Sequence, residues 1–288
     1  MNFKNKFLYS VTKNILSKNN TFKGFHRGES CYFFGNAKSL KYYDLSLFND
    51  KVSIGCNFLF LHKDFNNAGV NYYYNGDPFF LYPYAKNLYT KKFKKNTIGK
   101  LFVQKVKENP DINYFINISD YPMLRGKNIF YLHHFGEHFT DYSQCGLDTA
   151  FTATKSALSG MLGIAIYLGF KDATLVGFDH LLKPKASEHF YEYGKLDQVY
   201  EPTALHENFL IEAQKFLNLR VVSPNDSYKG HIIPHINYEH LTGNRALFRE
   251  NTEIIENRDL EKLRNSDFGF SITKNEFLNN NPGKLNLL

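Results

Sequence analysis

Residues 156–180 read SALSGMLGIAIYLGFKDATLVGFDH, and they carry the clearest structural pattern in the sequence. Its first part, 156–170, is apolar nearly all round, which predicts a buried helix, and Gly169 stands where a C-terminal cap is expected. The next residues, 172–176, predict a buried strand that ends at Gly177. A buried helix that leads directly into a buried strand is the repeating unit of a parallel sheet covered by helices.

The same alternation continues on both sides of this stretch. Helical patterns are predicted at 1–18, 91–108 and about 206–217. Short apolar runs predict further strands at 31–34, 52–61, 72–74, 112–116, 129–132 and 219–222. The chain is therefore predicted to be an α/β protein with a Rossmann-like, doubly wound and mostly parallel sheet and a lid-like loop region.

The predicted core domain spans 30–245 and includes a polar, aromatic loop at about 181–205, whose length is typical of lids and binding loops. The N-terminal extension, 1–29, carries a basic amphipathic helix, which could lie on a membrane surface or pack against its own domain or a partner subunit. The periodic pattern weakens past residue 240, so 246–288 is predicted to be a C-terminal extension that ends in a tail.

Composition and charge narrow the class of protein. The chain has 288 residues, of which 43% are hydrophobic and 22% charged, and these fractions predict a globular protein rather than a disordered one. The formal net charge of +7 allows an anionic partner. Because the sequence contains no nucleic-acid-binding motif, nucleic acid is not an expected partner.

Cysteine usage and hydropathy predict a cytoplasmic protein. Cys31, Cys56 and Cys145 cannot build a disulfide framework and are expected to be reduced. No apolar run approaches the roughly 18 residues that a membrane span needs, and Lys and Asn interrupt the N-terminal residues too often for a signal peptide. Peripheral association with the inner face of the cytoplasmic membrane stays open through the basic helix at 1–18.

Polar residues and glycines follow several predicted strands. In a doubly wound sheet, ligands bind beyond the carboxyl ends of the strands. That rule selects Gly35-Asn36, Cys56-Asn57, Asn75-Gly76-Asp77 and the residues 177–180. An Asn amide can bind a base, a ribose or a phosphate, and glycine lets the backbone approach a phosphate. Although Asn and Gly also form ordinary turns, these strand ends together predict a nucleotide site that lacks the GxGxxG and P-loop motifs.

The same blocks resemble a known family. Residues 35–40, GNAKSL, are similar to the Gly-Asn-Gly-Pro-Ser-Leu loop of the bacterial sialyltransferases of glycosyltransferase family 42 and of the related 6-hydroxymethylpterin diphosphokinase-like family. Other blocks of the sialyltransferases are similar to Cys56-Asn57-Phe58, Tyr74-Asn75, Ser159-Gly160, 167–171 and Gly177-Phe178-Asp179. The diphosphokinase-like relatives match the later region better, at His180, His189-Phe190 and 236–239. The chain departs from the sialyltransferases at Ala37, Lys38, Leu158 and His180, which leaves the donor sugar open.

The resemblance implies an inverting glycosyltransferase that moves a nonulosonic acid, such as sialic acid, from a CMP-sugar to a bacterial surface glycan, as in a lipooligosaccharide or capsule. It implies that the donor nucleotide lies at Gly35, Asn36, Ser39, Asn57, Asn75, Ser159, Gly160, Gly177 and Asp179. The CMP-sugar is a co-substrate, and no cofactor or metal is expected because it carries one phosphate and the sequence has no clear DxD motif. A glycolipid acceptor would suit the basic N-terminal helix, and a homo-oligomer stays open.

An inverting transfer needs a base for the acceptor hydroxyl and hydrogen-bond donors for the leaving phosphate. His206, at the start of the late helix, corresponds in position to the catalytic histidine of the sialyltransferases, and His189 and His180 are its rivals. Three residues of the long loop are candidates to bind the leaving phosphate or the acceptor: Tyr191, Tyr193 and Tyr200.

Three other interpretations stay open. His134 and His138 could share a helix face as metal ligands, but Gly136 disfavours a helix, and a structural or loop role is preferred. A diphosphokinase-like or other nucleotide-dependent transferase would need ATP and Mg²⁺. A protein of the same fold without a base would bind a nucleotide or a glycan and catalyse nothing.

Overall fold

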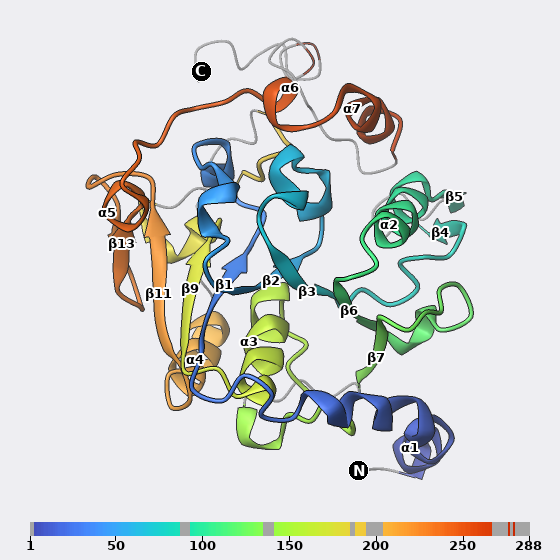
Figure 1. Ribbon diagram of the computed structural model, residues 1–288. Helices are drawn as coiled ribbons and strands as arrows, with labels where there is room; N and C mark the ends of the chain where they lie inside the picture. The colour runs from blue at the N-terminus through green and yellow to red at the C-terminus, as the bar shows by residue number, and fades with distance from the viewer. Residues whose placement is uncertain are drawn as a thin grey trace.

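The computed structural model describes residues 3–86, 93–134, 141–184, 188–193 and 204–266, together with Glu276 and Asn279. Its centre is a nine-stranded sheet in the order β13-β11-β9-β1-β2-β3-β6-β7-β8, and every neighbouring pair in it is parallel (Figure 1). The strands are β1 Ser30–Phe34, β2 Val52–Cys56, β3 Val70–Asn75, β6 Asn113–Asn117, β7 Ile129–His134, β8 Ala150–Phe151, β9 Asp172–Val176, β11 Asn218–Ser223 and β13 His235–Asn237.

The remaining elements surround this sheet. Two short antiparallel pairs lie outside it: β4 Tyr84–Lys86 with β5 Phe93–Lys95, and β10 Leu182–Lys183 with β12 Lys229–Gly230. The helices are α1 Phe3–Leu16, α2 Thr97–Glu108, α3 Ala157–Leu168, α4 Ala204–Ala213, α5 Tyr238–Thr242, α6 Asn251–Ile254 and α7 Asn257–Arg264. The predicted α/β, Rossmann-like, doubly wound sheet is thereby confirmed.

The order of the strands creates a topological switch point between β1 and β9. From β1 the chain builds β2, β3, β6, β7 and β8 outward on one side. It then returns to form β9, β11 and β13 on the other side, so the connections on the two sides of β1 run in opposite directions along the sheet. The carboxyl ends of β1 and β9 therefore mark the place where an open α/β sheet binds ligands.

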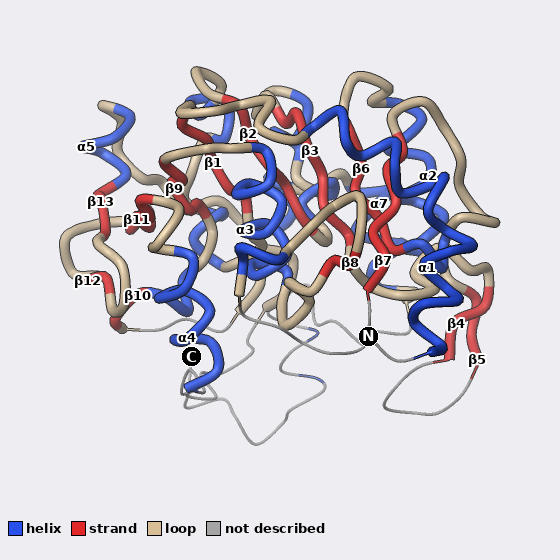
Figure 2. Tube along the Cα trace, turned by 90° about the horizontal axis from the view of Figure 1, so that it is seen from below, coloured by secondary structure: helices blue, strands red, loops and turns tan. Residues whose placement is uncertain are grey.

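Both faces of the sheet are buried (Figure 2). In β1, Cys31 and Phe33 join the hydrophobic cluster that contains α3 and α4, whereas Tyr32 and Phe34 join the cluster that contains α2 and α7. Burial on both sides explains why this strand is a continuous apolar run rather than an alternating one.

Helix α3, which was predicted as the buried helix at 156–170, begins and ends as the sequence indicates. Ser156 caps α3, because the Ser156 and Ser159 side chains each accept a hydrogen bond from the other's backbone N–H at 3.1 and 3.0 Å. Gly169 ends the helix with φ 89°, in the left-handed region that a side chain disfavours. The buried helix at 156–170 and its glycine cap are confirmed.

Three element predictions were wrong in detail. The strand expected at 52–61 stops at Cys56, because Asn57 adopts φ 52° and a 3-10 turn follows at Leu59–Leu61. The helix expected at about 206–217 ends at Ala213. The helix expected at 91–108 begins only at Thr97, and Phe93–Lys95 form strand β5 instead. The residues past 240, for which no element was predicted, form α6 and α7, and these helices are too short to give a clear period.

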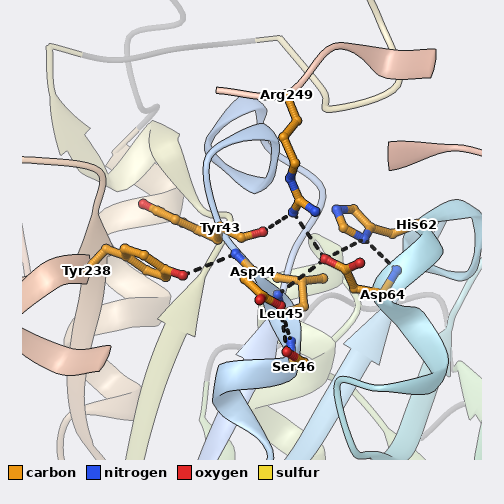
Figure 3. A network of polar contacts seen from close by, with 8 residues as sticks. All are labelled: Tyr43, Asp44, Leu45, Ser46, His62, Asp64, Tyr238 and Arg249. Carbon is orange, nitrogen blue, oxygen red and sulfur yellow. Dashed lines mark hydrogen bonds and ion pairs between the residues drawn. The ribbon is translucent and has the colours of Figure 1, made fainter. Parts of the chain in front are cut away.

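Arg249, between α5 and α6, is tied to the core by polar contacts (Figure 3). The Arg249 guanidinium donates to the carbonyl oxygen of Tyr43 and to Asp64 Oδ2, the latter at 3.1 Å. The Asp64 backbone N–H donates to Nδ1 of the buried His62 at 3.1 Å. Burial lowers the pKa of His62 to about 4.

The N-terminal helix lies beside the edge of the sheet. α1 contacts β7, and the Thr12 hydroxyl lies 3.3 Å from His133 Nδ1. Val11 on the same helix is exposed. Among the described residues, no helix is long and apolar enough to cross a membrane.

Candidate functional site

The carboxyl ends of four adjacent strands, β9, β1, β2 and β3, meet at one edge of the sheet. Asp179, Asn36 and Asn57 come after the ends of β9, β1 and β2, and Asn75 is the last residue of β3, so residues far apart in the sequence share this edge. We call it the carboxyl edge.

Two glycines allow the loops after β1 and β9 to touch. The Gly35 N–H donates to the Val176 carbonyl at 2.8 Å, and a Cβ on Gly35 would lie 2.3 Å from the Gly177 oxygen. Gly177 has φ 77°, and a Cβ there would lie 2.7 Å from the Leu40 side chain. Close packing within the chain therefore accounts for both glycines.

Asp179 is the most strongly perturbed acid at the switch point. It is 4% exposed, and its Oδ2 accepts a hydrogen bond from the Ser39 backbone N–H at 2.8 Å. Its other oxygen, Oδ1, and the Ser39 hydroxyl form no well-aligned hydrogen bond in the described part of the chain, although the Ser39 side chain lies close enough to Asp179 and Tyr43 to oppose the rise in the pKa of each. Burial raises the pKa of Asp179 to about 6, against the opposing effect of Ser39. Buried polar atoms normally have partners, and a bound water or a ligand would supply them here.

Asn36 and Asn57 have different roles. The Asn36 amide donates to the Cys56 carbonyl at 3.1 Å, and its oxygen accepts from the Phe58 N–H at 3.1 Å. Asn36 therefore holds the loop that carries Asn57. Asn57 is half-buried in a left-handed conformation, and its side chain forms no hydrogen bond with any other described residue. The amide of Asn57 is thus available to a ligand.

The first turn of α3 lies beside the end of β3. A Cβ on Gly160 would lie 2.3 Å from Tyr74 Cε1, so only glycine allows this approach. The Ser159 hydroxyl is engaged by Ser156, to whose carbonyl it donates at 2.9 Å. Asn75 Oδ1 accepts from the Asp77 N–H at 3.1 Å, and burial raises the pKa of Asp77. Gly160 and Ser159 shape this part of the edge through contacts within the chain.

Asn117, at the end of β6, continues the pattern, although it was missed from the sequence. Its amide donates to the Gly76 carbonyl at 3.1 Å and lies 3.1 Å from His134 Nδ1. The rule that selected the other strand ends would have found it. His134 belongs to strand β7, so the interpretation that it shares a helix face with His138 was wrong. His138 lies outside the described residues, and no group of three or more potential metal ligands occurs within them.

The segment 188–193 docks on the loop after β1. The Phe190 N–H donates to the Asn36 carbonyl at 3.0 Å, the Lys38 N–H donates to the Glu188 carbonyl at 2.8 Å, and Ala37 pairs with His189 as an antiparallel bridge. The backbone thus carries this part of the predicted lid to the switch point.

A buried lysine anchors the same segment. Lys41 is 1% exposed, and its Nζ donates to the Glu192 carbonyl at 3.0 Å and to Glu188 Oε1 at 3.5 Å. Lys38 Nζ lies 2.8 Å from Glu188 Oε2. Burial lowers the pKa of Lys41, and the neighbouring carboxylate opposes that effect. These charges were not predicted, because only the folded loop brings them together.

The candidate histidines lie in different surroundings. His189 Nδ1 is 2.8 Å from Glu192 Oε2, and the imidazole stacks on Tyr191 with ring centroids 5.1 Å apart. His180 is exposed in the turn after β9. His206 belongs to α4, and its side chain lies outside the description.

Two of the three candidate tyrosines fall within the docked segment. Tyr191 is buried, packs edge-on against Phe58 at 5.3 Å, and has a pKa well above its usual range because of burial. Tyr193 is half-buried, with its ring 5.8 Å from Lys41 Nζ. Tyr200 lies outside the described residues.

Comparisons with known proteins give likenesses of fold. No protein family and no curated protein matches the sequence. The sialyltransferase CstII from Campylobacter jejuni, in complex with cytidine-5'-monophosphate, is 15% identical with a TM-score of 0.43, over 83% of this chain and 98% of that one. CST-II in complex with a trisaccharide acceptor and CMP is 14% identical with a TM-score of 0.42, over 82% and 99%. The MAf glycosyltransferase from Magnetospirillum magneticum AMB-1 is 10% identical with a TM-score of 0.39, over 94% of this chain and 44% of that one.

Proposed function

We propose that the protein is an inverting glycosyltransferase that takes a nonulosonic acid from a CMP-sugar and transfers it to a glycan of the bacterial surface. The observation that carries the proposal is the carboxyl edge at the switch point, where Asp179 Oδ1 and the Ser39 hydroxyl are buried without a well-aligned hydrogen bond. The resemblance of the strand-end blocks to family 42 sialyltransferases supports a CMP-activated nonulosonic acid as the donor.

The groups along the edge fit the chemistry of a CMP-sugar. The Asp179 carboxylate and the Asn57 amide are groups of the kind that bind ribose hydroxyls and the edge of a cytosine base, and neither needs a metal to do so. Lys38, whose Nζ forms an ion pair with Glu188 Oε2 at 2.8 Å, is proposed as the cation that lies beside the single phosphate of the donor. The acceptor is proposed as a glycan, which offers the hydroxyl that an inverting transfer deprotonates.

A thermal-shift panel tests the nucleotide. CMP, CDP, UDP, GDP and ATP are each added with and without Mg²⁺. A bound ligand at a hundredfold excess over its Kd stabilises the folded protein by about 2.7 kcal/mol, which is several degrees of melting temperature. CMP is expected to stabilise the protein most, with no need for Mg²⁺. Stabilisation by ATP that requires Mg²⁺ would instead favour the diphosphokinase-like transferase.

A transfer assay then tests catalysis. CMP-N-acetylneuraminic acid is offered with a panel of oligosaccharides, and release of CMP is measured with and without each acceptor. Release that depends on an acceptor supports the proposal. CMP binding without release from any CMP-sugar would favour a nucleotide-binding protein that catalyses nothing.

A further inference from the structure

Glu192 and His189 form a carboxylate–imidazole pair at the switch point. His189 Nδ1 lies 2.8 Å from Glu192 Oε2, and the same oxygen accepts the His189 backbone N–H at 3.2 Å. Glu192 is 5% exposed, whereas the His189 side chain is 42% exposed. The pair therefore has a buried carboxylate behind an imidazole that reaches the surface.

Contacts on several sides hold this pair in place. His189 bridges to Ala37, and Lys41 Nζ donates to the Glu192 carbonyl at 3.0 Å. The imidazole stacks on Tyr191 with an interplanar angle of 5°, and Tyr191 packs against Phe58, the residue after Asn57. The imidazole is thus fixed next to the strand ends that are proposed to bind the donor.

The chemistry of the two side chains determines where the proton lies. An ionised carboxylate only accepts hydrogen bonds, so Glu192 requires the proton of a neutral imidazole to be on Nδ1. Nε2 then carries the lone pair, and it forms no hydrogen bond within the part of the chain that is described.

We propose that His189 is the general base of the transfer and that Glu192 is its positioning residue. In the reaction, the acceptor oxygen forms a bond to the anomeric carbon of the sugar as its proton moves to His189 Nε2. The bond between that carbon and the phosphate oxygen breaks, and CMP leaves with the electron pair. The role of His189 in transfer rests on the proposed function, whereas the tautomer of its imidazole can be measured independently of that function.

The experiment combines a spectroscopic and a kinetic readout on the full chain. Nitrogen-15 NMR of labelled histidines gives the tautomer of His189, which is assigned with the H189N variant. The variants for kinetics are H189A, E192Q and, as the matched control, E261Q on the exposed face of α7. CMP-induced thermal stabilisation is measured for each, to show that folding and donor binding persist.

The expected result is an Nδ1-protonated imidazole in the wild type and a mixture of tautomers in E192Q, because a Gln amide both donates and accepts. H189A is expected to lower kcat by about 100-fold or more and E192Q by about 10- to 100-fold, with little change in KM or CMP binding. E261Q should match the wild type. An Nε2-protonated imidazole in the wild type, or full kcat in E192Q, would overturn the proposal. If the wild type transfers no sugar, the proposed function fails, and the NMR result still decides whether Glu192 orients His189.

Discussion

Replacing Asp179 by Asn should change how stability depends on pH. The pKa of this carboxyl is 3.8 when it is exposed and about 6 in the folded protein, because burial disfavours the charge. A raised folded pKa contributes stability that is complete below pH 3.8 and is lost as pH rises through 6. The full contribution is about 3 kcal/mol, and the part gained between pH 8 and pH 5 is about 1.4 kcal/mol.

The asparagine variant lacks this titration. The free energy of unfolding of D179N, minus that of the wild type, should therefore fall by about 1.4 kcal/mol between pH 8 and pH 5. Urea unfolding followed by circular dichroism at both values measures it, and D111N, at an exposed position, is the matched control. The double difference cancels any change in hydrogen bonding that is the same at both pH values. An identical difference at pH 8 and pH 5 would refute the argument that Asp179 is destabilised by burial.

Three further predictions use other parts of the structure. Because the pKa of His62 is lowered to about 4 in the folded protein, protonation favours the unfolded state, and up to about 3 kcal/mol of stability should be lost as pH falls from 6.5 toward 4. H62Q should lack this pH dependence of the free energy of unfolding in the same assay. G160A should destabilise the fold by about 1–3 kcal/mol despite the better helix propensity of Ala, because its Cβ would meet the Tyr74 ring; a melting temperature equal to or above the wild type would contradict this packing. N57D should weaken CMP binding at least tenfold in calorimetry, because it places a negative charge at the carboxyl edge while Asp is nearly isosteric with Asn and tolerates a left-handed backbone. The control variant N66D, at an exposed position just before β3, should leave the affinity unchanged. Equal effects of both variants would count against the site.

The parts of the fold that follow from local pattern could be predicted. The apolar helix at Ala157–Leu168, its Ser156 cap and its Gly169 end depend on residues close in sequence, as does the buried strand Asp172–Val176. The same applies to the order of Asn36, Asn57 and Asn75 on one edge, because parallel strands bring their carboxyl ends together.

Features that arise from distant contacts could not be predicted. The end of β2 at Cys56 depends on the left-handed Asn57, whose backbone is fixed by Tyr73 and Tyr74 from the next strand. The burial of Lys41 against Glu188 and Glu192 depends on a loop about 150 residues away folding back onto β1. The periodicity of a sequence predicts only local structure, so it cannot indicate contacts between residues that tertiary packing brings together.

The most direct test of the account is a crystal structure of the protein soaked with CMP. Cytidine monophosphate is expected along the carboxyl edge, with the Asn57 amide and the Asp179–Ser39 pair in hydrogen-bond contact with it. An empty edge at a CMP concentration that stabilises the protein, or CMP bound on another face of the molecule, would contradict the account.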